Sequence, residues 1–64
     1  MSTLQLLLMG EYQAQRELGV TAANARTRAV TTMARRFDIT RAHAELELDA
    51  ALKMAHSTPV MLIA

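Results

Sequence analysis

The chain has 64 residues, no cysteine and a formal net charge of +1. A chain of this length buries only about 60% of the surface that its unfolded form exposes. Because cysteine is absent, disulfides and thiolate metal sites are excluded as sources of extra stability. We therefore expect one domain over residues 1–64 that is stabilised by packing, including packing against a second chain.

The composition favours helices. Hydrophobic residues make up 52% of the chain, yet only Tyr12 and Phe37 are aromatic, and there are two glycines and one proline. Alanine, leucine and methionine are strong helix formers. These features predict an all-α fold, a small three-helix bundle or helical hairpin array with an apolar C-terminal tail, completed by oligomerisation or by a partner.

The sequence contains no hydrophobic run that resembles a membrane span or a secretion signal. A membrane-spanning helix needs about 18 consecutive apolar residues, and no segment approaches that length. The N-terminus lacks the basic region and the cleavage site of a signal peptide. We expect a cytoplasmic protein, or a component of a particle that is assembled inside a cell.

The first predicted helix covers residues 3–18. Ser2 and Gln5 have the spacing of a capping box, in which each residue bonds the backbone N–H of the other. Gly19 stands where a glycine in the left-handed conformation commonly follows a helix. Both ends of this helix are therefore marked in the sequence.

An apolar run, residues 6–9, lies inside this segment and covers every side of a helix. It leaves an N-terminal strand as an alternative to the helix. Gly10 follows the run, and a glycine inside a helix costs roughly 1 kcal/mol relative to alanine. We interpret Gly10 as either a close-packing point or a break.

The second predicted helix covers residues 22–37, with Thr21 as its N-cap. At about 100° per residue, one face is apolar and the opposite face is polar. The apolar face holds Val30, Met33, Ala34 and Phe37, and the polar face holds Asn24, Arg28, Thr31, Thr32 and Arg35. Arg26 falls near the apolar face, where it either extends its guanidinium group to solvent or pairs with a carboxylate.

The third predicted helix covers residues 41–56 and follows a short connection, residues 38–40. Thr40 is suited to cap this helix, and Ile39 is suited to pack back against it. Pro59 disfavours helical geometry at the preceding residue and so ends the helix. Three (i, i+4) pairs are expected to support it by roughly 0.3 kcal/mol each. They are Arg41/Glu45, His43/Glu47 and Asp49/Lys53.

Charge is distributed unevenly along the chain. Residues 16–41 contain all six arginines with two acidic residues, whereas residues 42–56 contain three acidic residues and one lysine. One interpretation is charge pairing between helices, and the alternative is an anionic partner. The candidate contacts for such a partner are Arg28, Arg35, Arg36 and Arg41.

The third helix and the tail carry more apolar surface than a small monomer buries. The main stripe of the helix holds Ala44, Leu48, Ala51, Leu52 and Ala55, and a second stripe holds Leu46, Ala50 and Met54. The tail, residues 57–64, ends in Val60, Met61, Leu62, Ile63 and Ala64. Such surface packs on the chain's own core or docks into a partner. We predict a protein interface that comprises Leu46, Ala50, Met54, Val60, Met61, Leu62 and Ile63.

Residues 30–49 resemble a helix-turn-helix unit. Ala34 stands where that motif has a small residue, Ile39 where it has an aliphatic residue after the turn, and Phe37, Thr40 and Ala44 also suit their positions. The resemblance implies a DNA-binding regulator in which Thr40, Arg41, His43 and Glu45 open a recognition helix, while Arg28, Arg35 and Arg36 approach phosphates.

The sequence departs from that motif at two positions. Asp38 replaces the glycine that is common in the turn, and Glu47 replaces an aliphatic residue. Glu45, Glu47 and Asp49 would also repel a phosphate backbone. DNA binding is therefore the alternative function and not the main expectation.

The sequence shows no convergent set of polar groups of the kind that catalysis needs. His43 and Glu47 share a helix face, but two ligands do not make a metal site, and an exposed helix-stabilising pair accounts for them. We expect a non-enzymatic protein-interaction module without cofactor, metal or small-molecule substrate. It would be a small subunit of a larger assembly, or a compact inhibitor or adaptor, and we hypothesise a bacteriophage source. The expected partner is another protein or further copies of the chain.

Overall fold

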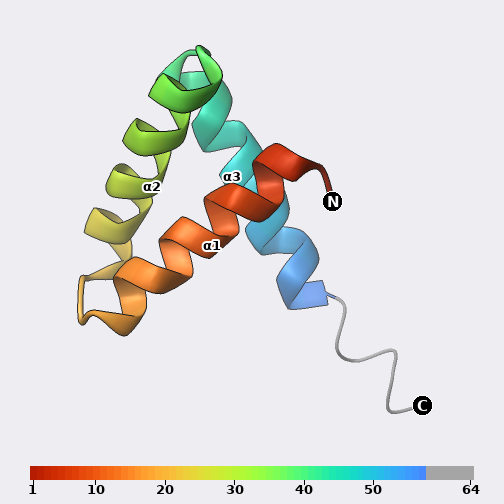
Figure 1. Cartoon of the computed structure of the whole chain (residues 1–64). Coiled ribbons are helices and arrows are strands. Elements are labelled where there is room, and N and C mark those ends of the chain that lie inside the picture. The colour runs from red at the N-terminus through yellow and green to blue at the C-terminus, as the bar shows by residue number, and fades with distance from the viewer. Residues whose placement is uncertain (58–64) are drawn as a thin grey trace.

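The computed structural model describes residues 1–57, which form three α-helices. They are α1 (Thr3–Glu17), α2 (Ala22–Phe37) and α3 (Arg41–Ser57) (Figure 1). The predicted all-α, three-helix fold is confirmed, although α1 ends one residue earlier and α3 one residue later than expected. The apolar run in α1 is helical, so the alternative of an N-terminal strand is wrong. The tail residues of the predicted interface, Val60, Met61, Leu62 and Ile63, lie outside the described residues.

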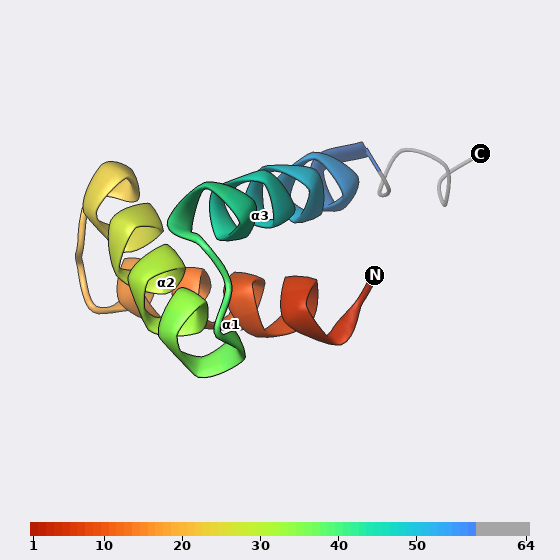
Figure 2. The same ribbon diagram turned by 90° about the horizontal axis from the view of Figure 1, so that it is seen from above.

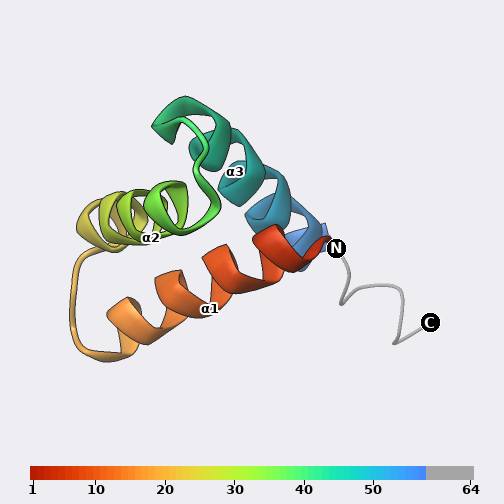
Figure 3. The same ribbon diagram turned by 45° about the horizontal axis from the view of Figure 1, so that its top comes forward.

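The three helices pack around one another. In Figure 1, α2 and α3 are the two arms of an inverted V, joined at the apex by residues 38–40. α1 runs across the open side of this V, from its N-terminus beside α3 to its C-terminus near the start of α2 (Figures 1 and 3). Seen from above, α3 lies on one side of α1 and α2 (Figure 2). Each pair of helices is in contact, so each helix buries one face against the other two.

Hydroxyl side chains cap the starts of all three helices. Ser2 Oγ accepts from the N–H of Gln5 at 3.1 Å, and Gln5 Oε1 accepts from the N–H of Ser2 at 2.9 Å. The hydroxyl groups of Thr21 and Thr40 each accept from the backbone N–H three residues on, at 3.3 and 3.1 Å. These bonds satisfy N–H groups that have no partner within the helix. The predicted caps and the capping box are confirmed.

The first two helices end on residues in the left-handed conformation. Gly19 has φ 89°, and Asp38 has φ 54°. In each case the next residue donates its N–H to the carbonyl group five positions back, at 3.1 Å for Val20 and 3.0 Å for Ile39. This is the Schellman geometry that closes a helix C-terminus. Glycine adopts it without a steric cost, whereas Asp38 is a tolerated exception.

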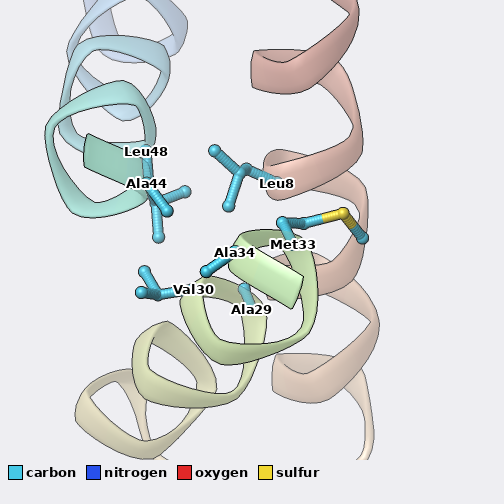
Figure 4. Close-up of a cluster of buried hydrophobic side chains, with 7 residues drawn as sticks. All are labelled: Leu8, Ala29, Val30, Met33, Ala34, Ala44 and Leu48. Carbon is cyan, nitrogen blue, oxygen red and sulfur yellow. The ribbon is translucent and has the colours of Figure 1, made fainter. Parts of the chain in front are cut away.

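The core lies where the three helices meet. Its seven residues are Leu8 of α1, Ala29, Val30, Met33 and Ala34 of α2, and Ala44 and Leu48 of α3 (Figure 4). Figure 4 shows Leu8 directed from α1 toward Leu48, with the α2 side chains beneath them. The alanines allow the helix backbones to approach closely, so the largest side chains, Leu8 and Leu48, fill the centre at 0% exposure.

Two expectations for apolar and glycine positions are corrected by the structure. Phe37 shares the apolar face of α2 in the sequence, yet it is 37% exposed, because it is the last residue of α2 and the turn at Asp38 follows it. Gly10 is neither a packing point nor a break. α1 is continuous through it, and a Cβ atom added there would meet nothing within 4 Å.

Candidate protein-binding surface

The candidate surface is centred on the outward face of α3. Leu46 is 70% exposed there, although Ala44 and Leu48, two residues to either side, are fully buried. Two residues along an α-helix correspond to a rotation of about 200°, so Leu46 must point away from the core if its neighbours point into it. Of the other residues in the predicted second stripe, Met54 is 40% exposed and Ala50 is half-buried.

Further exposed leucines lie on α1 and after it, and sequence analysis did not assign them to an interface. Leu6 is 57% exposed, and Leu18, which follows the last residue of α1, is 77% exposed. The available signal for Leu6 was the apolar run that covers every side of the helix. Because α1 buries only the face around Leu8, a leucine on the opposite face remains in solvent.

A hydrogen bond joins α1 to α3. Gln5 Nε2 donates to Glu47 Oε1 at 2.9 Å. On its other side, Glu47 Oε2 lies 3.4 Å from His43 Nε2. Glu47 therefore holds a structural position at the α1–α3 junction.

An ion pair joins α2 to α3. Arg26 Nη1 donates to Asp49 Oδ1, which decides between the two interpretations of Arg26 in favour of a carboxylate partner. The hydrogen bond from Arg26 lowers the pKa of Asp49 and raises the pKa of Arg26, and Coulombic attraction between the two groups acts in the same directions.

Two of the three predicted (i, i+4) pairs are wrong. Among the described residues, Arg26–Asp49 is an ion pair and His43 Nε2 lies 3.4 Å from Glu47 Oε2, so only the His43/Glu47 contact forms as expected. Asp49 turns toward α2 and does not pair with Lys53, and Arg41 does not reach Glu45. Tertiary packing brings a guanidinium group to Asp49 that spacing along a single helix does not reveal.

The four arginines predicted to contact an anionic partner do not form one cluster. Arg28 donates to Gln15 Oε1 at 3.3 Å and lies against α1. Arg35 and Arg41 line a groove of about 380 Å³ between the end of α2 and the start of α3, together with Thr31, Ala34 and Ile39. Arg36 is exposed and does not line this groove. Within residues 1–57, none of these four arginines pairs with a carboxylate.

The groove is amphipathic. Its floor includes Ala34, which is 7% exposed, and Ile39, which packs against the core cluster. Arg35 and Arg41 are exposed, so their guanidinium groups stand beside an apolar surface. Sequence analysis had named both arginines but not the groove, because the turn at Asp38 is what brings residues 35 and 41 to one site.

The described part of the chain offers neither a metal site nor a membrane-spanning helix. Residues 1–57 contain no group of three or more histidine, cysteine, aspartate or glutamate side chains arranged to hold a metal ion. None of the helices in that range has both the length and the apolar character needed to cross a bilayer. Comparison with protein-family models, with curated proteins and with solved structures finds no match to this chain.

Proposed function

We propose that the chain is a non-enzymatic protein-binding module, a small subunit of a larger assembly or a compact inhibitor or adaptor. Its contact surface would be centred on Leu46. The observation that carries the proposal is the 70% exposure of this leucine in the middle of a helix whose other face is fully packed. Burying a leucine side chain that was exposed yields about 1.5–3 kcal/mol, enough for one residue to dominate a small interface.

Isolated exposed leucines are common on protein surfaces, so the setting of Leu46 matters. It sits on a regular helix, so its position is already ordered before any partner binds, and binding costs less entropy there than on a loop. Ala50 and Met54 continue along the same side of α3 at spacings of four residues. Met54, like Leu46, is an exposed hydrophobic side chain on this side.

A photo-crosslinking residue placed at position 46, in cells that express the chain, tests this proposal. We expect a discrete adduct with a protein, and none from the matched position Gln13, which is exposed on α1. Met54→Asp should weaken an adduct that forms at position 46, because it adds charge to the same side of α3. Equal labelling at positions 13 and 46, or labelling of DNA instead of protein, would contradict the proposal.

The second candidate function is DNA binding through residues 30–49, and a specific observation favours it. Asp38 occupies the place of the turn glycine in the helix-turn-helix pattern, and it has the left-handed conformation that such a glycine provides. The departure at this position is therefore one of residue type and not of backbone geometry. In addition, Arg28 and Arg35 lie on the exposed side of α2.

Fluorescence anisotropy with a labelled random-sequence duplex separates the two functions. A DNA-binding protein should lose affinity steeply as salt rises, and Arg28→Ala combined with Arg35→Ala should weaken binding and reduce the salt dependence. If the chain is a protein-binding module, the duplex should not bind at about 150 mM salt, and Arg28→Ala, which lies outside the groove, should leave the crosslink at position 46 unchanged.

A further inference from the structure

One surface of this chain is complementary to another surface of the same chain. The groove has an apolar floor, Ala34 and Ile39, flanked by the guanidinium groups of Arg35 and Arg41. The outward face of α3 has an apolar ridge, Leu46, preceded by the exposed carboxylate of Glu45. The groove offers cations around an apolar surface, and the ridge offers an anion beside an apolar side chain.

We propose that a second copy of the chain occupies the groove, with its Leu46 on the floor formed by Ala34 and Ile39 and its Glu45 between Arg35 and Arg41. This inference rests on the proposed function, because it takes Leu46 as the contact residue and adds the identity of the partner. Burial of Leu46 supplies the hydrophobic part of the binding free energy. The contacts between the guanidinium groups and the carboxylate fix how the two copies are aligned.

The apolar floor of the groove favours a second copy over DNA. Phosphates would neutralise Arg35 and Arg41 but would leave the apolar floor and Leu46 in water. In the proposed contact, Leu46 of the second copy covers that floor while its Glu45 binds the two arginines.

The groove and the ridge lie on different sides of α3. Leu46 follows Arg41 by five residues, which places it about 140° away around the helix axis. The groove and the ridge of one chain therefore contact different copies, and the assembly that they form is a ring or a filament built from one repeated interface.

Mixing of two defective variants tests the pairing directly. Arg35→Glu combined with Arg41→Glu destroys the groove and keeps the ridge, whereas Leu46→Asp destroys the ridge and keeps the groove. We expect light scattering at about 1 mM to show each variant alone at the monomer mass of 7.1 kDa. An equimolar mixture should double that mass, because one intact groove then meets one intact ridge. The wild-type chain should exceed the monomer mass without mixing.

Circular dichroism is the control for folding, and it should show that each variant keeps the helicity of the wild type. If Arg35→Glu combined with Arg41→Glu unfolds the end of α2, Arg35→Gln combined with Arg41→Gln takes its place. A monomeric wild type, or a mixture that stays monomeric, would overturn the inference. Association that survives in both variants would also overturn it, because the interface would lie elsewhere. A crosslink from position 46 to a different protein, together with a monomeric wild type, would leave the proposed function standing while this inference fails.

Discussion

Gln5 Nε2 donates a hydrogen bond to Glu47 Oε1 at 2.9 Å, across 42 positions of sequence. The same Gln5 side chain accepts from the N–H of Ser2 through Oε1 at 2.9 Å. One carboxamide group therefore closes the capping box of α1 and attaches the first turn of that helix to α3. The first turn of α1 is ordered by local and long-range bonds at once.

Gln5→Glu separates these two roles. Glutamate keeps the oxygen that accepts the capping bond, but it loses the Nε2 donor and places a second carboxylate beside Glu47. We expect the free energy of unfolding at pH 7, measured by urea denaturation, to fall by about 1–2 kcal/mol. The loss should shrink at acidic pH, where protonation of either carboxyl group restores a donor.

The double variant Gln5→Glu with Glu47→Gln is the control for this prediction. It rebuilds the pair with the donor and acceptor exchanged, so most of the lost free energy of unfolding should return. If the changes in unfolding free energy of the two single substitutions simply add in the double variant, the hydrogen bond between α1 and α3 does not couple these residues.

The Arg26–Asp49 pair predicts a pH dependence of stability. The pKa of Asp49 is lowered in the folded chain. The ion pair therefore stabilises the fold at pH values above the pKa of Asp49 in the unfolded chain, about 3.9. This stabilisation is lost as the pH falls through the lower pKa of the folded chain. The carboxylate is 56% exposed, so solvent limits the contribution to about 0.5 kcal/mol. Asp49→Asn should lower the unfolding free energy by that amount at pH 7, and the difference from the wild type should disappear as pH falls below the lowered pKa of Asp49.

Two substitutions distinguish the actual partner of Asp49 from the one that helical spacing indicates. NMR titration of the Asp49 carboxyl carbon should show its pKa rising toward the ordinary value in Arg26→Gln. The same titration should be nearly unchanged in Lys53→Gln. The reverse result would restore the (i, i+4) pair that the structure contradicts.

The helix ends predict a stabilising substitution. Asp38 holds the left-handed conformation with φ 54°, which glycine adopts at a lower cost. Asp38→Gly should raise the free energy of unfolding by about 0.5–1 kcal/mol, as measured by thermal denaturation.

The matched control is Gly19→Asp, where φ is 89° and an added Cβ atom would meet nothing within 4 Å. Since no clash is created there, we expect the free energy of unfolding to fall by about 1 kcal/mol, and this loss would reflect the left-handed backbone conformation alone. If both substitutions shift stability in the same direction, the conformational explanation of these two ends is wrong.

Two leucines of α1 should differ in how strongly their truncation to alanine lowers the stability of the fold. Leu8 is fully buried at the centre of the core, so Leu8→Ala should lower the unfolding free energy by about 3 kcal/mol. A chain of this size has a total stability of roughly 3–10 kcal/mol, so this loss should be visible as partial unfolding at 37 °C. Leu6→Ala removes the same atoms from an exposed site and should change stability by less than about 0.5 kcal/mol. A comparable loss from both would mean that Leu6 is covered in solution.

The local features of the helices could be predicted from the sequence because their causes are local. Ser2 and Gln5, Thr21, Thr40 and Gly19 act on backbone groups within a few residues, so spacing along the chain is enough to identify them. The apolar face of α2 could also be predicted, since Val30, Met33 and Ala34 follow the helical period. Residue type and order determined the number of helices and their ends.

The partners of polar side chains were decided only by tertiary structure. Arg26 and Gln5 reach Asp49 and Glu47 on a helix far away in sequence, and no pattern within one helix contains that information. The two apolar stripes of α3 could be separated by their helical spacing, but only the positions of α1 and α2 determine how much of each is buried. The groove between Arg35 and Arg41 arises in the same way, because the left-handed turn at Asp38 sets the direction in which α3 leaves α2.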